Sequence, residues 1–198
     1  MGYCNWPEMS AIDRVYHDTE WGVPIWDDRA MFEHLSLECM QCGLSWDLML
    51  KKRSIMFECF EGYDYDAIAK YGEFEIERIL ATDGMIRSRR KIEAIVANAS
   101  RFLEVRAEFG TFCDYLWGWT DRKSIVYRSH DNMRIPAGNP LSSQIAADLK
   151  KRGFRFVGAI TMYAHLQACG MINDHDRDCP RFQYIVDRYP TVVKKRGY

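Results

Sequence analysis

Long apolar runs are missing from this 198-residue sequence, and no segment approaches the roughly 18 consecutive apolar residues that a membrane-spanning helix needs. The first residues contain neither a basic start nor an apolar core, so we expect no secretory signal peptide and a cytoplasmic protein. Internal repeats and low-complexity tracts are also missing. With 47% hydrophobic residues, the chain is long enough for one sizeable core.

An excess of charge of one sign is absent as well. The 27 basic and 28 acidic residues leave a formal net charge of −1. Bulk electrostatics therefore indicates no nucleic-acid partner, and any such binding must depend on local patches. Candidate basic patches lie at residues 51–53, 87–91 and 150–152, although each could equally be a solvated helix face.

An even set of cysteines, as a disulfide framework requires, is missing too. The seven cysteines are expected to be free thiols or metal ligands in a reducing compartment. They are Cys4, Cys39, Cys42, Cys59, Cys113, Cys169 and Cys179.

What the sequence does contain is helical periodicity. Apolar residues recur at helical spacing from Asp27 to about Cys42, with Asp27 or Asp28 as a plausible N-cap. Gly43 ends this segment, and Ser45 can cap the next helix. No convincing set of strands is found, residues 122–139 resemble a long loop, and an all-α architecture is predicted. The expected helices cover residues 27–42, 45–60, 64–71, 73–82, 88–108, 111–119, 142–151 and 159–169.

A short segment bounded by Gly153 and Gly158 separates the last two of these helices. Two helices joined by such a hairpin expose main-chain N–H groups that can hold a phosphate. The segment is therefore a candidate for binding a nucleic-acid backbone.

Cysteine and histidine residues occur in pairs near both ends of the chain. Cys4 and His17 lie near the start, and His175 and Cys179 lie near the end. Two thiolates and two imidazoles suit a tetrahedral structural zinc ion that would join the terminal segments. The spacing does not show that the pairs meet, so a buried histidine with small buried cysteines remains the alternative.

Aromatic residues are dense in the first quarter of the chain and accompany one carboxylate, Glu38. Such aromatics usually belong to the core, which is the interpretation we favour for Trp26. A nucleobase, however, needs a ring to stack on and a hydrogen-bonding partner at its edge, which Trp46 and Glu38 together offer. Glu38 could alternatively be a surface acid paired with a basic residue. The aromatic set is Trp6, Tyr16, Trp21, Trp26 and Trp46.

Several motifs together resemble the 3-methyladenine DNA glycosylase I (Tag) family of the helix-hairpin-helix superfamily. They follow the order and spacing of that family over residues 4–179. The motifs are YHDTEWGVP at 16–24, QCGLSW at 41–46, IRSRRKI at 86–92, KKRGFRFVG at 150–158 and QACGMINDH at 167–175.

The resemblance implies one helical unit over residues 1–198, with two lobes and a helix-hairpin-helix element at about 142–169. It implies that Cys4, His17, His175 and Cys179 bind one structural zinc ion per chain, which joins segments 1–25 and 170–185. Asp174 would then orient this metal site, or act as a weak catalytic candidate.

The resemblance also implies an activity: hydrolytic excision of 3-methyladenine from double-stranded DNA, with the free base as product and without a lyase step. Glu38 would be the catalytic residue, and the flipped base would be bound by Tyr16, Trp46, Trp6 and Trp21. Contacts with DNA would come from Leu44 as a wedge, from Gly43, and from Gly153, Phe154 and Gly158 at the hairpin. We expect a monomer without membrane contact.

Two positions depart from the family pattern, which usually has a small residue at 39 and alanine at 42. This chain has Cys39 and Cys42, whose spacing also permits a thiol redox or metal sensor, although a thioredoxin-like βαβ context is absent. A non-enzymatic, zinc-stapled DNA-binding module is the other alternative. The sensor would need reactive thiols of low pKa, whereas the glycosylase would have inert, buried thiols.

Overall fold

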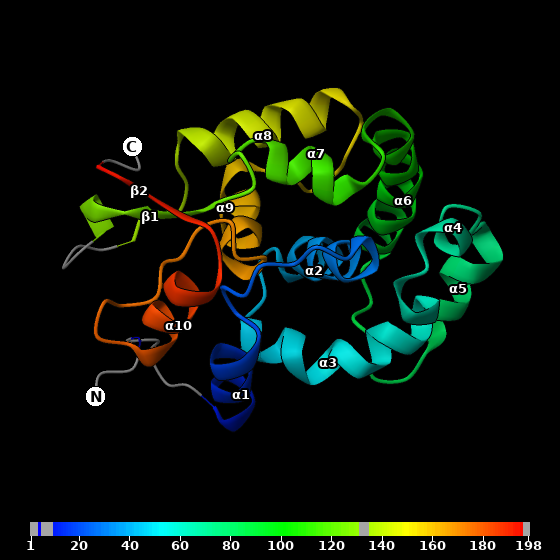
Figure 1. Cartoon of the computed structure of the whole chain (residues 1–198). Coiled ribbons are helices and arrows are strands. Elements are labelled where there is room, and N and C mark those ends of the chain that lie inside the picture. The colour runs from blue at the N-terminus through cyan, green and yellow to red at the C-terminus, as the bar shows by residue number, and fades with distance from the viewer. Residues whose placement is uncertain (1–3, 5–9, 131–134, 196–198) are drawn as a thin grey trace.

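The computed structural model describes residue 4, residues 10–130 and residues 135–195 (Figure 1). This part of the chain is mostly helical, with α2 near the centre and packed against α3, α6 and α9. None of its helices combines the length and apolar character needed to cross a lipid bilayer. The elements are α1 (Ala11–Thr19), α2 (Asp28–Gln41), α3 (Trp46–Cys59), η1 (Glu61–Tyr63), α4 (Tyr65–Ile68), α5 (Glu73–Ala81), α6 (Arg89–Phe109), α7 (Phe112–Gly118), β1 (Ser124–Tyr127), η2 (Arg128–His130), α8 (Pro140–Lys151), α9 (Ala159–Ala168), α10 (Pro180–Arg188) and β2 (Thr191–Lys194).

Side-chain caps fix the starts of the helices that position the cavity described below. The side chain of Asp27 accepts a hydrogen bond from the Ala30 amide at the start of α2, and Ser45 accepts one from Leu48 at the start of α3. Ser45 was predicted as a cap, and Asp27 was one of the two candidates, with Asp28, for the other. Each cap satisfies an amide that has no partner within the helix. Gly43 adopts a φ of +81° between the two helices, a conformation that favours glycine.

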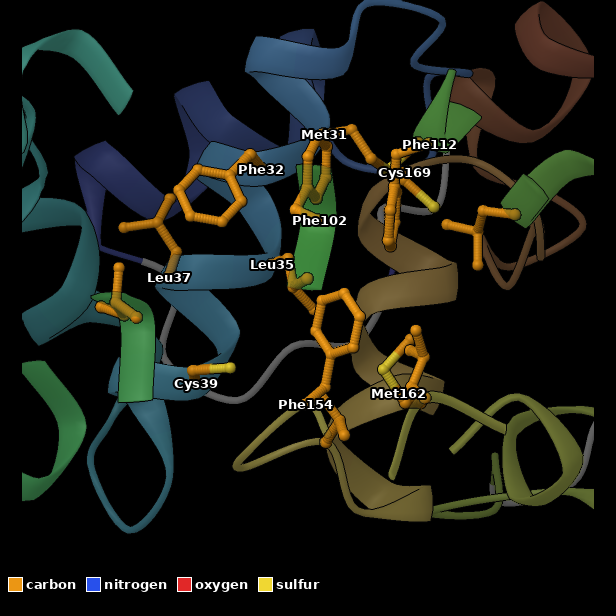
Figure 2. Packing of buried hydrophobic residues seen from close by; sticks show 14 of the residues in the cluster. Met31, Phe32, Leu35, Leu37, Cys39, Phe102, Phe112, Phe154, Met162 and Cys169 are labelled. Carbon is orange, nitrogen blue, oxygen red and sulfur yellow. The ribbon is translucent and has the colours of Figure 1, made fainter. Parts of the chain in front are cut away.

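The hydrophobic core surrounds α2 (Figure 2). Phe32 and Leu35 of α2 are fully buried, and Phe102 of α6 stacks on Phe112 of α7 with ring centroids 4.2 Å apart. Each fully buried side chain of this size stabilises the fold by roughly 1.5–3 kcal/mol. The core thus holds α2, which carries Glu38, rigidly between α6 and α9.

The prediction of an all-α architecture without strands is wrong in one respect. Residues 124–127 form β1, which pairs in parallel with β2, and Ile125 forms a further bridge with Ile172. These residues were predicted to belong to a long loop. The sequence of β1 is only Ser-Ile-Val-Tyr, and its partner strand lies more than 60 residues further along the chain, so local periodicity gives no signal.

The structure also contains a helix near each chain end that was not predicted. Helix α10 begins at Pro180, because proline is well suited to the first position of a helix. Helix α1 was not predicted, although Ser10 and Asp13 form a reciprocal capping box at its start. Trp26 is 42% exposed instead of belonging to the core, and it stacks on the buried Trp117.

Candidate active site and metal site

A cavity of about 800 Å³ lies where α1, α2, α3 and α9 meet. We call it the central cavity. It brings together four of the residues predicted to act on a base, namely Tyr16, Trp21, Glu38 and Trp46. The residues that line it are Ser10, Asp13, Tyr16, Trp21, Glu38, Gln41, Ser45, Trp46, Asp47, Lys51, Ile135, Ala164 and Gln167.

Glu38 lies in the last turn of α2 and is only 5% exposed. Burial raises the pKa of its carboxyl group to about 8, because the charged form loses hydration. The surface ion pair considered as an alternative is therefore excluded. A buried carboxyl group without a cationic partner gains from any positive charge that enters the cavity.

Aromatic rings form one wall of the central cavity. The Tyr16 and Trp46 rings lie 5.3 Å apart at an angle of 48°, and the Tyr16 ring also stacks on His34. Burial, followed by the nearby Glu38, raises the pKa of the Tyr16 hydroxyl well above its usual range, so the phenol stays protonated. The Trp46 Nε1 atom is buried without a hydrogen-bond partner in the described part of the chain. Trp6, which was also predicted to contact the base, lies outside the described residues.

The turn between α2 and α3 is braced by its neighbours. The Gln41 Nε2 atom donates to the Leu44 carbonyl oxygen at 2.6 Å, and the Leu44 amide donates to the Gln41 carbonyl oxygen at 2.6 Å. Lys91 Nζ donates to the carbonyl oxygens of Met40 and Cys42 at 2.7 and 2.6 Å, so a cation caps the carboxyl end of α2. Leu44 is half-buried at the tip of this rigid turn.

The hairpin between α8 and α9 spans residues 152–158. Two of its amide groups already have hydrogen-bond partners within the protein. The Gly153 amide donates to the Lys150 carbonyl oxygen, and the Phe154 amide donates to the Leu149 carbonyl oxygen. The Phe154 side chain is 4% exposed and packs in the core, so Phe154 anchors the hairpin and presents no side chain to solvent (Figure 2). Gly158 is the N-cap of α9 without a side-chain cap, and a Cβ atom there would meet open space.

Asn98 of α6 forms hydrogen bonds with the main chain of this hairpin. No role for Asn98 was predicted from the sequence. Its Nδ2 atom donates to the Arg155 carbonyl oxygen at 3.0 Å, and its Oδ1 atom accepts from the Arg155 amide at 2.7 Å. Asn98 is 2% exposed. A polar residue on the buried face of a predicted helix is the signal that could have revealed it.

Cys39 and Cys42 are free thiols near the carboxyl end of α2. Cys39 is fully buried, and burial raises the pKa of its thiol, so the thiolate that a redox sensor would need is disfavoured. The Cys42 Sγ atom is half-buried and lies 3.5 Å from the Thr161 hydroxyl group. The helical setting also differs from that of thioredoxin-like proteins.

The three basic patches contain both residues with ion-pair partners and exposed residues, which include Arg87 and Arg90. Lys51 pairs with Asp47 at 2.5 Å. The remaining ion pairs join Arg53 to Glu20 and Glu33, Arg89 to Glu73, and Arg152 to Asp148 and Glu108. Lys150 and Lys151 remain exposed at the end of α8.

Cys4, His17, His175 and Cys179 meet in one buried group, which we call the Cys/His cluster. Their ligand atoms lie within 4.8 Å of one another. His175 Nδ1 lies 3.4 Å from Cys4 Sγ, 3.2 Å from His17 Nε2 and 3.8 Å from Cys179 Sγ. The predicted meeting of the two chain ends is thus present, and the cluster could hold a metal ion.

The outer nitrogen atoms of the cluster's imidazoles are held by oxygen atoms. His17 Nδ1 lies 2.8 Å from Asp18 Oδ1, and His175 Nε2 lies 3.0 Å from the Trp21 carbonyl oxygen. Such acceptors fix the ring orientation and leave the inner nitrogen of each ring for a metal. Gly22, with a φ of +80°, lets the chain pass the ring, because a Cβ atom there would lie 3.0 Å from His175 Nε2.

Burial shifts the pKa of two members of the cluster. It lowers the pKa of His175 to about 4 and raises the pKa of the Cys4 thiol, so a neutral imidazole stands beside a thiol. A bound metal cation would favour the deprotonated form of the thiols, because the thiolate is the form that binds metal.

Three residues near the central cavity were missed or misplaced by sequence reasoning. Asp13 and Gln167 line the cavity. Asp13 lies outside the quoted motifs, and Gln167 begins the QACGMINDH motif but was assigned no role. Asp174 was expected beside the metal site, but its carboxylate accepts hydrogen bonds from Tyr163 and Gln167 on α9. It therefore lies behind the wall of the central cavity.

Comparison with known proteins agrees with this arrangement. The family model for methyladenine glycosylases matches residues 6–183. The chain is 38% identical over 179 residues to DNA-3-methyladenine glycosylase 1 of Escherichia coli K12, covering 90% of this chain and 96% of the relative. It is 40% identical over 177 residues to DNA-3-methyladenine glycosylase of Haemophilus influenzae, covering 89% and 96%.

A solved structure supports the same grouping. The structure of a Tyr-to-Phe variant of 3-methyladenine DNA glycosylase I (TAG) in complex with 3-methyladenine matches with a TM-score of 0.84 and 32% identity. The match covers 91% of this chain and 97% of that one. Fold and site thus define a helical glycosylase of alkylated DNA. The chain belongs to the methyladenine glycosylase family.

Proposed function

We propose that this protein removes 3-methyladenine from alkylated double-stranded DNA by hydrolysis and leaves an abasic site. The observation that carries the proposal is Glu38, a buried carboxyl group with a raised pKa in an aromatic-walled cavity. The names of the relatives and the 3-methyladenine bound in a related structure support it.

The chemistry of the substrate matches this cavity. Methylation at the 3 position makes adenine cationic, which weakens its bond to the sugar and makes it a good leaving group. The ionised Glu38 favours the cation and accepts a hydrogen bond from an N–H at its edge. As the glycosidic bond breaks, the base leaves and water attacks the oxocarbenium-like sugar.

The aromatic wall would bind the extruded base. Trp46 offers a ring face for stacking and for a cation–π contact, and the Tyr16 hydroxyl and Trp21 complete the wall. Normal adenine lacks the charge and has a stronger glycosidic bond and an intact base pair to break. The enzyme can therefore discriminate between 3-methyladenine and adenine although the two bases have similar shapes.

Two half-buried features would hold the DNA. Leu44, at the braced turn that includes Gly43, would fill the space that the extruded base leaves. The amino end of α9 at Gly158 would take a backbone phosphate, because the first amides of a helix have no internal partner. Gly153, with a φ of +93°, shapes the hairpin that presents this end.

A lyase step would require a nucleophilic lysine in the central cavity. Lys51 borders the cavity, but its Nζ atom donates to the Asp47 carboxylate at 2.5 Å. Lys150 and Lys151 lie at the exposed end of α8. We therefore propose a hydrolase without lyase activity. We also propose that the protein acts as a monomer.

The metal of the Cys/His cluster would be zinc. A tetrahedral zinc ion with bonds of about 2.0–2.3 Å spaces its ligands roughly 3.3–3.8 Å apart. The separations of 3.2, 3.4 and 3.8 Å around His175 Nδ1 are close to that range. The ion would be structural, because four protein ligands leave no position open for a substrate.

The test is to incubate the protein with methylated DNA and to identify the released bases, in parallel with Glu38→Gln. We expect wild-type protein to release 3-methyladenine and Glu38→Gln to release far less. Glu58→Gln is the matched control, because it makes the same chemical change at an exposed position of α3. If folded, zinc-loaded protein released no modified base, the non-enzymatic DNA-binding module would replace this proposal.

A further inference from the structure

Gln167 places a side-chain amide at the edge of the central cavity. It lies in the last turn of α9, and its Nε2 atom donates to Asp174 Oδ2 at 2.9 Å. Tyr163, one turn earlier on the same helix, donates its hydroxyl to the same oxygen at 2.6 Å. The other oxygen, Oδ1, lies 2.7 Å from His130 Nδ1.

These contacts hold Asp174 at both of its oxygens. Its side chain is 1% exposed and has three hydrogen-bonding partners, which come from η2 and α9. A buried carboxylate held in this way is fixed in position, and it in turn holds the amide of Gln167.

The contact also decides which way the amide of Gln167 faces. A carboxylate only accepts hydrogen bonds, so the NH₂ group must point toward Asp174 and the carbonyl oxygen Oε1 must point away from it. Within the described residues, no hydrogen bond reaches Oε1. Because Gln167 borders the cavity, an acceptor is available in the same space as the Glu38 carboxyl group.

We propose that Gln167 Oε1 accepts a hydrogen bond from the exocyclic amino group of the bound base, and that Asp174 is the positioning residue for this contact. The inference rests on the proposed function and extends it to the choice of base. An amino group carries two N–H bonds, so it can serve Glu38 and Gln167 together. A base with a carbonyl group at this edge would place its oxygen, an acceptor, against the acceptor Gln167 Oε1. Such a base would therefore bind poorly.

The choice of glutamine fits the electrostatics of the cavity. A second carboxylate beside Glu38 would add like charge in a buried space, whereas an amide oxygen adds an acceptor without charge. A hydrogen bond to a cationic ligand is stronger than one between neutral groups. The contact thus favours an amino-bearing cation and adds no buried charge to the empty cavity.

The test compares two free bases, 3-methyladenine and 3-methylhypoxanthine, which carry an amino and a carbonyl group at the same position. We expect Gln167→Met to weaken 3-methyladenine binding about 3- to 10-fold, as the loss of one hydrogen bond implies. Binding of 3-methylhypoxanthine should stay the same or improve. Asp174→Asn should reduce the preference for the amino-bearing base in the same direction, because it frees the amide of Gln167.

Tyr163→Phe is the matched control, since it removes a donor to the same Asp174 oxygen and leaves the Gln167 contact in place. It should retain the wild-type preference between the two bases. Melting temperature and metal content identify variants that are merely damaged, and Gln167→Leu replaces Gln167→Met if the latter does not fold.

The outcomes separate this inference from the proposed function. If wild-type protein excises 3-methyladenine and Gln167→Met weakens both bases equally or neither, the inference is overturned and the function stands. If wild-type protein neither binds nor releases 3-methyladenine, the proposed function and this inference both fall.

Discussion

The Asn98 side chain forms two hydrogen bonds with the main chain of Arg155, at 3.0 Å to the carbonyl oxygen and 2.7 Å from the amide nitrogen. The contact joins the middle of α6 to the hairpin before α9. Next in the chain, Phe156 has a φ of +57°, which is uncommon for a residue with a side chain. Asn98 thus holds the hairpin in a conformation that the hairpin's own sequence does not favour.

Asn98→Ala should therefore loosen the hairpin. We expect the free energy of unfolding to fall by about 2–3 kcal/mol, because two main-chain groups lose their partner. DNA affinity should fall more than affinity for free 3-methyladenine, since α9 lines the central cavity with Ala164 and Gln167, whereas the hairpin precedes the start of α9. Urea titration and equilibrium binding measure both effects. Ser100→Ala on the same helix is the control, and equal losses in both affinities would contradict the prediction.

Lys91→Met should destabilise the turn that presents Leu44. The substitution removes the cation that caps the Met40 and Cys42 carbonyl oxygens while keeping an unbranched side chain. We expect a loss of about 1–2 kcal/mol in unfolding free energy and a lower excision rate on duplex DNA. On single-stranded DNA the excision rate should change less, because the extruded base leaves no gap in a duplex for Leu44 to fill. An unaltered duplex rate would show that the cap does not matter for the turn.

The pH dependence of excision should follow the ionisation of Glu38. The carboxyl group of the empty cavity has a pKa of about 8, and the charged form is the one that favours the cationic base. Below this pKa, kcat/KM should therefore rise about tenfold per pH unit, and it should level off above it. In Glu38→Gln the residual activity should lose this slope. A wild-type profile that is flat between pH 6 and 8 would remove Glu38 from this role.

The same pKa predicts how stability changes with pH. The folded-state pKa of Glu38 is raised above its ordinary value of 4.5, so the folded protein binds a proton that the unfolded chain releases. This contribution is fully present below pH 4.5 and is lost as the pH rises through about 8. Glu38→Gln should therefore be the more stable protein at pH 8–9, by an amount on the order of a few kcal/mol. Glu58→Gln should match wild type, and thermal melts across this pH range make the comparison.

Metal removal should act on stability first. Chelation would leave two thiols and two imidazoles buried without their ion, and we expect the melting temperature to fall by at least several degrees. Asp18→Asn weakens the acceptor for His17 Nδ1 and should lower metal affinity about 10- to 100-fold in a chelator competition. Asp83→Asn, at an exposed turn, is the control. A metal-free preparation that melts like the wild type would refute the cluster's role.

The sequence was enough to predict those helices and turns whose boundaries depend on residues close together in the chain. Asp27, Gly43 and Ser45 mark the boundaries of α2 and α3 through caps and turn geometry that act within a few residues. It was not sufficient for β1, whose partner lies far along the chain. The site residues came from motifs, whereas the contact between Asp174 and Gln167 depends on the packing of α9 against residues 173–175. No local pattern encodes that packing.

If it holds a metal ion, the Cys/His cluster gives the chain the topology of a ring. Cys4 and His175 are 171 positions apart and their ligand atoms lie 3.4 Å from each other. With a metal bound, the intervening residues form a closed loop, so α1 cannot fray away from the core as terminal helices usually can. The residue beside the ligand His17 is Tyr16 of the cavity wall. In the metal-bound protein, the wall of the central cavity would therefore have no free end from which local unfolding could begin, although it is built by one of the first segments of the chain.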